Sequence, residues 1–493
     1  MLDFSDSIAA IATPPGRGGI AIVRISGNDA LKIAQILTSP QALTSDDSQP
    51  AASAAPAASA ESATAAESAV PNFKPRYAYF RKFYHGTEAV DEGVVLYFAS
   101  PHSYTGEDVV ELQGHGGNVA PQRVLSAVLA LNKVAGIKVR MAEPGEFTRR
   151  AFLNGKMDLT AAEAVEDLIS AGSDSAAKAA LASLNGAFAS RLEQLSNDLT
   201  QFRVRLEACL DFPEEHEDFF DSGKAGDELN HLQDLTAQAV TIAHQGIKLN
   251  EGARIVLAGQ PNAGKSSLLN ALAGTERAIV TNIPGTTRDV LTVNLEIGGI
   301  PVTITDTAGL RDQPSDEIEA IGIKRALDEL KQADLILLMV DSSKPAYDTL
   351  EALKHIQKIF DNPKNLLVLR SKVDLPADEQ TAALLNSEPL KNYEQIDTST
   401  KTADGLDALR RKLHEILGVI PSEGVFSARR RHLSELQECA AALDRATQML
   451  TMGDLVLTAR EIALAQEHLG TITGKITSDD ILGIIFSTFC IGK

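Results

Sequence analysis

The chain has 493 residues, 44% of them hydrophobic, and its formal net charge is −20 at neutral pH. This length allows about three domains, because roughly 100–200 residues per domain is usual. Proteins that bind nucleic acid mainly by neutralising phosphates are usually basic, so the negative charge argues against that class. We expect any RNA contact to come from a local basic patch or from a partner protein.

The cysteines and the N-terminus indicate a reducing intracellular compartment. Cys209, Cys439 and Cys490 form no Cys-x-x-Cys pair and are too few and too dispersed for a disulfide framework or a zinc site. No apolar stretch approaches the roughly 18 residues that span a bilayer. The opening residues are acidic, whereas a signal peptide begins with positive charge. We therefore expect a soluble, cytoplasmic protein without membrane contact.

An α+β domain is expected over residues 1–155. Three stretches in it, 19–27, 77–84 and 93–100, are rich in β-branched or aromatic residues and are bounded by Gly, Pro or Ser, which is typical of strands. Residues 41–72, in contrast, are rich in Ala and Ser and almost free of large apolar side chains. Such a segment cannot bury enough surface to offset its ordering entropy, so we predict a disordered insertion.

The hydrophobic pattern takes a helical period after Thr160. Thr160 and Glu163 have the spacing of a capping box at a helix start. Apolar residues of one long amphipathic helix then recur every three or four positions, at Leu181, Leu184, Phe188, Leu192, Leu195, Leu199, Phe202 and Leu206. The irregular charges beside this seam favour a bundle helix within its own chain over an intermolecular coiled coil.

A second helical part follows much later in the sequence. Its pattern returns only after residue 425, at Leu433, Leu436, Ala440, Leu443 and Leu450. The economical arrangement is a helical domain made of residues 156–250 and 421–493, interrupted by an inserted domain at residues 251–420.

The inserted domain opens with a phosphate-binding pattern. Residues 254–272, "RIVLAGQPNAGKSSLLNAL", have the pattern of a buried strand, a Gly-rich turn and a helix start, and Gly259 to Ser266 match G-x-x-x-x-G-K-[ST]. In this motif backbone amides bind phosphate oxygens, Lys265 contacts the β- and γ-phosphates, and the Ser266 hydroxyl binds Mg²⁺. The sequence therefore predicts a Ras-like P-loop α/β domain.

Three further stretches follow in the order that a GTPase requires. Thr287 is suited to Mg²⁺ and the γ-phosphate, and residues 306–309, "DTAG", offer a carboxylate to the metal shell and a glycine amide to the γ-phosphate. Lys372 and Asp374 end another buried strand. Asp374 can accept hydrogen bonds from the ring N–H and the exocyclic amine of guanine, which favours GTP over ATP.

Some positions depart from the usual GTPase pattern. Ser371 stands where the guanine motif Asn-Lys-x-Asp has asparagine, so we expect Asp374 to keep the specificity at a lower nucleotide affinity. Residues 399–401, "STK", resemble the last guanine-contact loop. Leu310 follows Asp-x-x-Gly directly, where Ras-type proteins have a glutamine. Leucine has no hydrogen-bonding group and cannot orient the attacking water.

With these motifs, the chain resembles the MnmE (TrmE) family, which comprises bacterial and organellar GTPases that modify the wobble uridine of certain tRNAs. The resemblance covers nearly the whole sequence except the Ala/Ser-rich insertion. It rests on the segments "TPPGRGGIAIVRISG", "SYTGEDVVELQGHGG", "EPGEFTRRAFLNGKMDL", "GQPNAGKSSLLNAL", "GTTRD", "DTAGLR" and the terminal "FCIGK". Several of these are not general GTPase motifs, which makes the resemblance specific.

The resemblance implies a way to hydrolyse GTP despite Leu310. In the family a potassium ion takes the place of an arginine finger, and a fixed cation beside the β/γ-bridging oxygen stabilises the charge that develops there. The matching potassium ligands are Asn262, Thr281, Ile283 and Thr286. The family positions the water indirectly through a glutamate that corresponds to Glu319, with one more residue than usual before it. The alternative is that Glu319 is one carboxylate of an acidic helical face.

The motifs and the resemblance together give the set of nucleotide-site residues. The implied catalytic residues are Lys265 and Glu319, and the implied Mg²⁺ ligands are Ser266 and Thr287. The implied GTP-binding residues are Asn262, Ala263, Gly264, Lys265, Ser266, Ser267, Thr281, Asn282, Ile283, Pro284, Gly285, Thr286, Thr287, Asp306, Thr307, Ala308, Gly309, Lys372, Asp374, Ser399, Thr400 and Lys401.

The resemblance also implies that the N-terminal domain dimerises and binds a tetrahydrofolate derivative, in the 5-formyl or 5,10-methylene form. The candidate folate contacts are Arg24, Glu111, Lys156 and Lys493. A glutamate can pair with the N–H edge of a pterin, and Lys and Arg suit the folate carboxylates. The alternative for Arg24 is a paired structural arginine. Cys490 is either a reactive thiol near the folate or a buried small hydrophobe.

The function implied is a potassium-activated GTPase that adds a carboxymethylaminomethyl or aminomethyl group to C5 of the wobble uridine, position 34. A flavin-dependent partner of the MnmG type would join it in a heterotetramer and carry the FAD. Residues 427–432, "SARRRH", are a candidate tRNA contact or a solvated helix start. Two alternatives stay open. A ribosome-assembly GTPase should carry a basic RNA-binding module, and none is found in the sequence. A folate-dependent enzyme with a merely regulatory GTPase would form product without hydrolysis.

Overall fold

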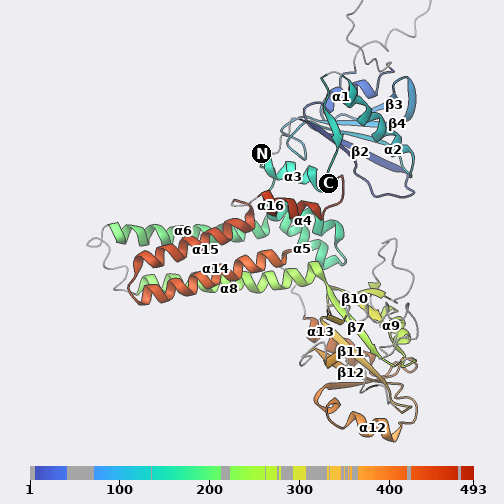
Figure 1. Ribbon diagram of the computed structural model, residues 1–493, viewed down its shortest axis with the longest axis vertical. Coiled ribbons are helices and arrows are strands. Elements are labelled where there is room, and N and C mark those ends of the chain that lie inside the picture. The colour runs from blue at the N-terminus through green and yellow to red at the C-terminus, as the bar shows by residue number, and fades with distance from the viewer. Residues whose placement is uncertain are drawn as a thin grey trace, which may run out of the picture. The chain divides into compact units, whose positions relative to one another are not determined.

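A computed structural model of the chain gives two compact units, Met1–Glu163 with Thr473–Lys493, and Ala164–Ile472 (Figure 1). The structure describes residues 6–40, 71–134, 136–211, 223–260, 262–274, 277–278, 292–306, 330–331, 333–345, 349, 353–354, 356–357, 365–418, 424–475 and 479–492. The insertion predicted at residues 41–72 lies outside these residues except for its last two positions.

The first unit is built on a six-stranded sheet with the order β3-β4-β5-β2-β1-β6. Its strands are β1 Ser7–Ile11, β2 Ile20–Ser26, β3 Tyr79–His85, β4 Glu88–Phe98, β5 Val109–His115 and β6 Val139–Met141. All neighbours pair antiparallel except β1 and β6, which pair parallel. The strands predicted in residues 19–27, 77–84 and 93–100 are confirmed as β2, β3 and β4.

Successive side chains of a strand point to opposite faces of the sheet, and helices cover the apolar side chains of this sheet. On β2, Val23 and Ile25 enter the main core with residues of α1 Ala30–Leu37 and α2 Ala120–Ala130, which the short 3₁₀ helix Leu131–Lys133 follows. Beyond the sheet, Phe147 of α3 Glu146–Leu153 packs with residues of β1. The C-terminal helix α16 Asp479–Ser487 belongs to this unit and packs with Leu159 at the start of α4 Leu159–Ser170.

The second unit contains a bundle of long helices (Figure 1). They are α5 Asp174–Leu184, α6 Ala187–Asp211, α8 Lys224–Glu251, α14 Arg430–Thr451 and α15 Leu455–Thr473. One hydrophobic core joins residues 188–243 to residues 426–472. Helices that precede the seven-stranded sheet in the sequence therefore share a core with helices that follow it. The bundle helices predicted before residue 250 and after residue 425 are thus present.

Two local predictions about the helices are wrong. The start of α4 is capped by Asp158, whose carboxylate accepts a hydrogen bond from the Ala161 N–H at 2.9 Å. The Thr160 hydroxyl donates a hydrogen bond to the same carboxylate at 2.6 Å. Thr160 is therefore no cap. The predicted single long helix is two helices, because the chain breaks between α5 and α6 at Gly186, where φ is +85°. Leu181, predicted to lie on the apolar seam, is exposed.

The second unit also contains a seven-stranded sheet with the order β13-β12-β11-β7-β10-β9-β8. The strands are β7 Ala253–Gly259, β8 Arg277–Ala278, β9 Thr292–Ile297, β10 Ile300–Asp306, β11 Leu335–Asp341, β12 Leu366–Ser371 and β13 Glu394–Thr398. The five strands from β13 to β10 are parallel to one another. Strand β9 pairs antiparallel with β10, and β8 pairs antiparallel with β9. Every residue of β11 is buried, as expected for a parallel strand covered on both faces.

One face of this sheet is covered by helices α9 Lys265–Ala273 and α13 Leu406–Leu417. The core on the other face includes Leu385 of α12 Glu379–Leu385 and Leu390 of the 3₁₀ helix Leu390–Asn392. The predicted mixture of α+β, helical and α/β parts is confirmed. In a parallel sheet of this kind, ligands bind at the carboxyl ends of the strands. The candidate nucleotide site is therefore expected at the carboxyl ends of β7, β10, β12 and β13.

Candidate functional site

The loop after β7 has the backbone that a phosphate-binding loop needs. Gly259 has φ of +142°, and a Cβ there would lie 2.3 Å from the Met339 carbonyl oxygen, so only glycine fits between β7 and β11. Asn262 and Gly264 also have positive φ, +64° and +102°. Helix α9 begins directly after Gly264, so its free N–H groups face the loop and can bind an anion.

Lys265 is placed inside this loop. Its side chain is 6% exposed, and its ammonium donates to the carbonyl oxygens of Gly259 at 3.0 Å and Gln260 at 3.1 Å. The Nζ atom lies 3.8 Å from Oδ1 of Asp306, too far for a hydrogen bond. Burial lowers the pKa of Lys265, and the Asp306 carboxylate partly opposes that effect. A cation held in this way is suited to phosphate oxygens.

Asp306, at the end of β10, has the chemistry of a metal-shell carboxylate. Its Oδ1 atom is buried and has no hydrogen-bond partner. Burial raises the pKa of Asp306, while Lys265 and the Ser266 hydroxyl counteract the rise. A buried carboxylate oxygen that accepts no hydrogen bond and faces the Lys265 ammonium at 3.8 Å is an arrangement that a bound cation would stabilise. Hard oxygen donors of this kind fit Mg²⁺.

The guanine-recognition residues lie at the ends of β12 and β13. Asp374 accepts a hydrogen bond from the hydroxyl of Ser399 at 2.7 Å, and this buried hydroxyl also accepts the backbone N–H of Lys401 at 3.3 Å. Asp374 and Thr400 are exposed. The structure thus brings together the predicted base contacts of the two loops, with Asp374 free to face a ligand on its other edge.

Ser371 takes a structural role at the first position of the guanine motif. Its hydroxyl is buried and lies 2.7 Å from the carbonyl oxygen of Ala263 in the P-loop and 3.1 Å from that of Val340. The neighbouring Lys372 donates to the carbonyl oxygen of Asn262 at 2.7 Å and to Asp341 Oδ2 at 2.7 Å. Sequence reasoning missed Asp341, although a carboxylate at the end of the apolar run "LILLMVD" is a usable signal.

Several predicted nucleotide-site residues lie outside the described residues. These are Leu310, Glu319, Thr281, Asn282, Ile283, Pro284, Gly285, Thr286, Thr287, Thr307, Ala308 and Gly309. Within the described part of the chain, the site comprises the P-loop, Asp306 and the two base-contact loops.

In the first unit, the structure pairs two of the predicted folate contacts with each other. Arg24 on β2 and Glu111 on β5 are directly opposite in the antiparallel register, and Glu111 Oε1 accepts from Nε of Arg24 at 3.1 Å and from Nη2 at 2.9 Å. Both side chains are only partly exposed, 21% and 14%. The Arg24 guanidinium also lies 5.6 Å from the ring centre of Tyr104 and 5.8 Å from that of Phe147.

Lys156 lies against the same loop as this pair. Its ammonium donates to the Pro101 carbonyl oxygen at 2.9 Å, and Tyr104 of that loop carries the ring beside Arg24. Lys156 is exposed, so it can reach a ligand. Lys493 lies outside the described residues. Arg24, Glu111 and Lys156 therefore border one region of the first unit.

Comparison with known families and proteins agrees with these features. One family model, described as the MnmE helical domain, matches residues 159–490, and another, described as the GTP-binding protein TrmE N-terminus, matches residues 7–156. The chain belongs to the MnmE family of GTPases. The resemblance inferred from the sequence motifs is thereby confirmed, as is the predicted enzyme class of a GTP hydrolase.

Curated relatives match over their whole length. A protein named tRNA modification GTPase MnmE from Marinomonas sp. (strain MWYL1) is 44% identical over 502 residues, covering 100% of both chains. One of the same name from Pectobacterium carotovorum is 45% identical over 501 residues, covering 99% of both. Among solved structures, the G domain of the T. maritima FeoB iron transporter is 28% identical and covers 34% of this chain and 99% of its own, with a TM-score of 0.27, too low to bear on the fold.

Cys490, in the terminal segment that resembles the MnmE family, is exposed, so the alternative of a buried hydrophobe is wrong. The segment docks on the first unit through Gly492, where φ is +102° and a Cβ would lie 2.4 Å from the Ile11 carbonyl oxygen. The other two cysteines are buried in the bundle. Burial raises the pKa of Cys439 to about 12, so Cys490 is the thiol that is accessible for chemistry.

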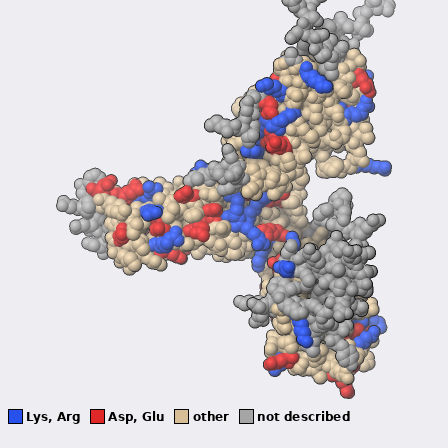
Figure 2. Space-filling model, in the orientation of Figure 1, with Lys and Arg blue, Asp and Glu red and all other residues tan. Residues whose placement is uncertain are grey.

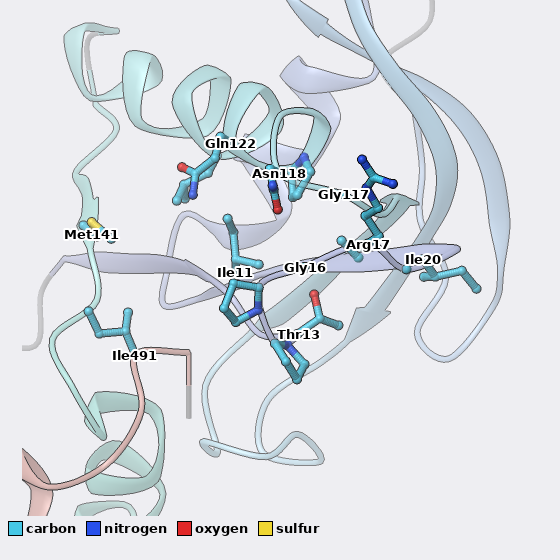
Figure 3. Close-up of a pocket in the computed structure, with 16 residues that line it drawn as sticks. Ile11, Thr13, Gly16, Arg17, Ile20, Gly117, Asn118, Gln122, Met141 and Ile491 are labelled. Carbon is cyan, nitrogen blue, oxygen red and sulfur yellow. The ribbon is translucent and has the colours of Figure 1, made fainter. Parts of the chain in front are cut away.

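A pocket of about 670 Å³ lies beside this terminal segment (Figure 3). In the view, Met141 and Ile491 are on the left, and Arg17 and Ile20 are on the right. Polar groups on its lining come from Thr13, Arg17, Asn118 and Gln122. Of the predicted folate contacts that the structure describes, Arg24, Glu111 and Lys156, none lines the pocket. Sequence reasoning missed this cavity, whose signal is the Gly-rich run "TPPGRGG".

The arginines of residues 427–432 hold the start of α14 in place. Arg429 pairs with Glu166 and Asp167 at 2.6 and 2.7 Å, Arg430 pairs with Glu251 at 2.8 Å, and Arg431 donates to the Thr471 carbonyl oxygen at 3.2 Å. On the face drawn in Figure 2, acidic and basic side chains are interspersed over the bundle. Each of these arginines is thus engaged within the fold, and only Arg430 is largely solvent-exposed.

In the part of the chain that the structure describes, no helix is both long enough and apolar enough to span a bilayer.

Proposed function

We propose that the protein is a GTPase of tRNA modification that adds a carboxymethylaminomethyl or aminomethyl group to C5 of the wobble uridine, position 34. It works with a flavin-dependent partner of the MnmG type, in a heterotetramer built on a homodimer of the N-terminal domain. FAD resides on the partner, and the one-carbon unit comes from a tetrahydrofolate derivative. The protein works in the cytoplasm.

The observation that carries this proposal is the match to relatives named tRNA modification GTPases, with 44% identity over 100% of both chains. A full-length match includes the N-terminal and helical parts as well as the P-loop sheet. The acidity of the chain supports a division of labour, because a net charge of −20 leaves much of the tRNA binding to the partner.

The nucleotide site supports hydrolysis through this chain's own side chains. Lys265 neutralises charge on the β- and γ-phosphates, and the N-terminus of α9 orients them. Ser266 and Asp306, joined by Thr287, would hold Mg²⁺, which would supply positive charge to the phosphate oxygens. Asp374 reads the guanine edge.

The step that Leu310 cannot assist is assigned to two other groups. Glu319 would position the water, and Asn262, Thr281, Ile283 and Thr286 would hold a potassium ion that supplies positive charge to stabilise the leaving oxygen. The Asn262 side chain is exposed, so it is accessible to a bound ion. Hydrolysis drives a conformational cycle and not the carbon chemistry, because no motif places GTP near the folate contacts.

The Arg24–Glu111 pair is the proposed centre of the folate site. Both side chains retain some exposure and can exchange part of their mutual hydrogen bonding for a ligand, with Glu111 facing the pterin edge and Arg24 or Lys156 facing carboxylates. The exposed Cys490 is a candidate thiol for the one-carbon chemistry.

Replacing Arg24 or Glu111 by alanine is expected to weaken binding of 5-formyltetrahydrofolate by about tenfold or more, because a charge-assisted hydrogen bond is lost. Isothermal titration calorimetry measures this directly. Arg81→Ala is the matched control, since Arg81 lies on an exposed part of β3 in the same sheet and should bind folate normally. Native affinity in both Arg24→Ala and Glu111→Ala would refute the assignment.

The function itself is tested by mass spectrometry of tRNA nucleosides from a strain that lacks the gene. We expect the wobble-uridine modification to disappear in this strain and to return when the native chain is expressed. Normally modified tRNA in the deletion strain would rule the proposal out and would direct attention to ribosome assembly.

A further inference from the structure

Asp341 is a buried carboxylate that connects two loops of the nucleotide site. It ends β11, between the strands that carry the P-loop and the guanine motif, and its side chain is 6% exposed. Its Oδ2 accepts from the Lys372 ammonium at 2.7 Å. Its Oδ1 accepts from the backbone N–H and the hydroxyl of Ser343 at 3.0 and 2.7 Å. Both oxygens are thus satisfied within the fold.

Lys372 passes this restraint on to the P-loop. Its ammonium donates to the Asn262 carbonyl oxygen at 2.7 Å, and the adjacent Ser371 hydroxyl lies 2.7 Å from the Ala263 carbonyl oxygen. Lys372 and Asn262 have φ of +60° and +64°, conformations that cost energy for residues other than glycine. Such conformations persist where surrounding contacts impose them, and here the two strained residues are hydrogen-bonded to each other.

The geometry points to Asp341 as a positioning residue for nucleotide binding. It fixes the Lys372 ammonium on the Asn262 carbonyl, so the guanine loop and the P-loop are held in one arrangement before the nucleotide arrives. This inference rests on the proposed use of both loops to bind GTP. It also gives a role to Ser371, whose hydroxyl supplies a second hydrogen bond between the guanine loop and the P-loop.

The test compares native chain, Asp341→Asn, Lys372→Met and the double variant in the full-length protein. We expect Asp341→Asn to raise the Kd for GDP about tenfold, the size typical of one lost charge-assisted hydrogen bond. The turnover number at saturating GTP in potassium chloride should stay within about twofold of native, because bound nucleotide restores the arrangement of the loops. Since Asp341 acts through Lys372, the double variant should bind no more weakly than Lys372→Met.

The control is Asp397→Asn, which removes the exposed ion pair to Arg370 on the adjacent strands of the same sheet and should leave the Kd unchanged. A native Kd in Asp341→Asn, or effects of the two substitutions that simply add, would overturn the inference. If Asp341→Asn does not fold, Asp341→Glu, which keeps the charge but displaces it, is measured with the same expectation and the same overturning result. A native chain that binds no GDP would instead overturn the nucleotide site itself, and the inference with it.

Discussion

A Lys265→Ala variant is expected to hydrolyse GTP on the order of 100- to 1000-fold more slowly than the native chain at saturating nucleotide. Lys265 is buried in the P-loop, and its ammonium lies 3.8 Å from Asp306, where the phosphates and Mg²⁺ are expected. Removing this cation leaves the charge that develops on the phosphoryl oxygens less stabilised. It also leaves the Asp306 carboxylate without its positive neighbour.

Phosphate release in single-turnover conditions measures this rate without interference from product dissociation. Lys391→Ala is the matched control, because Lys391 lies in the same sheet domain in an exposed pair with Glu388 and should hydrolyse GTP normally. A Lys265→Ala rate within tenfold of the native rate would contradict the role given to this lysine.

An Arg150→Met variant is expected to lose about 3–5 kcal/mol of stability in the first unit. The Arg150 side chain is 1% exposed and pairs with Asp6 at 3.0 Å, Glu107 at 3.2 Å and Glu146 at 2.9 Å. Methionine keeps much of the volume but leaves three carboxylates close together with less compensating charge. Buried charges that lose their partner are strongly destabilising.

Hydrogen exchange of β1 and β2 peptides in the full-length protein reports this loss, and peptides of the bundle provide an internal reference. Arg123→Met is the control, since its pair with Glu88 is exposed and should contribute less than about 1 kcal/mol. Equal protection of β1 and β2 in the native chain and in Arg150→Met would show that the network does not stabilise the unit.

The same network determines how the stability of the first unit changes with pH. Burial alone would raise the pKa of Glu146, but hydrogen bonds from Arg140, the Glu143 N–H and Arg150 lower it below its ordinary value of 4.5. A carboxylate with a lowered pKa stabilises the fold fully above the unfolded value. That contribution is lost as the pH falls from about 4.5 through the lower folded pKa.

The sequence predicted those parts of the site whose chemistry is local. The P-loop is recognisable because eight consecutive residues, Gly259 to Ser266, carry the turn, the lysine and the metal-binding hydroxyl. The strands that flank it are predicted by their apolar runs. Asp374 and Ser399 are each marked by a short motif, although their mutual hydrogen bond is visible only in the structure.

The parts that could not be predicted depend on pairing across the chain. Arg24 and Glu111 are 87 positions apart, and only the register of β2 with β5 makes them partners. Asp341 has a local partner in Ser343, but its ion pair with Lys372 joins residues 31 positions apart. The sheet decides both contacts, and no local pattern encodes them.

The two errors in the helices have local causes. Asp158 and Thr160 both carry groups that can cap a helix. The Asp158 carboxylate is the stronger acceptor and takes the Ala161 N–H, and the Thr160 hydroxyl donates a hydrogen bond to that carboxylate. The spacing of Leu184 and Phe188 continues across the break at Gly186, so periodicity alone could not detect where α5 ends.

The most direct test of the central claim, that GTP hydrolysis by this chain drives tRNA modification, uses the deletion strain with Glu319→Gln. Nucleoside mass spectrometry is carried out on tRNA from strains that express the native chain or the variant at equal levels. We expect the native chain to restore the wobble-uridine modification and Glu319→Gln to leave it absent. Full restoration by Glu319→Gln would contradict the account, since modification would then proceed without the hydrolytic step assigned to that residue.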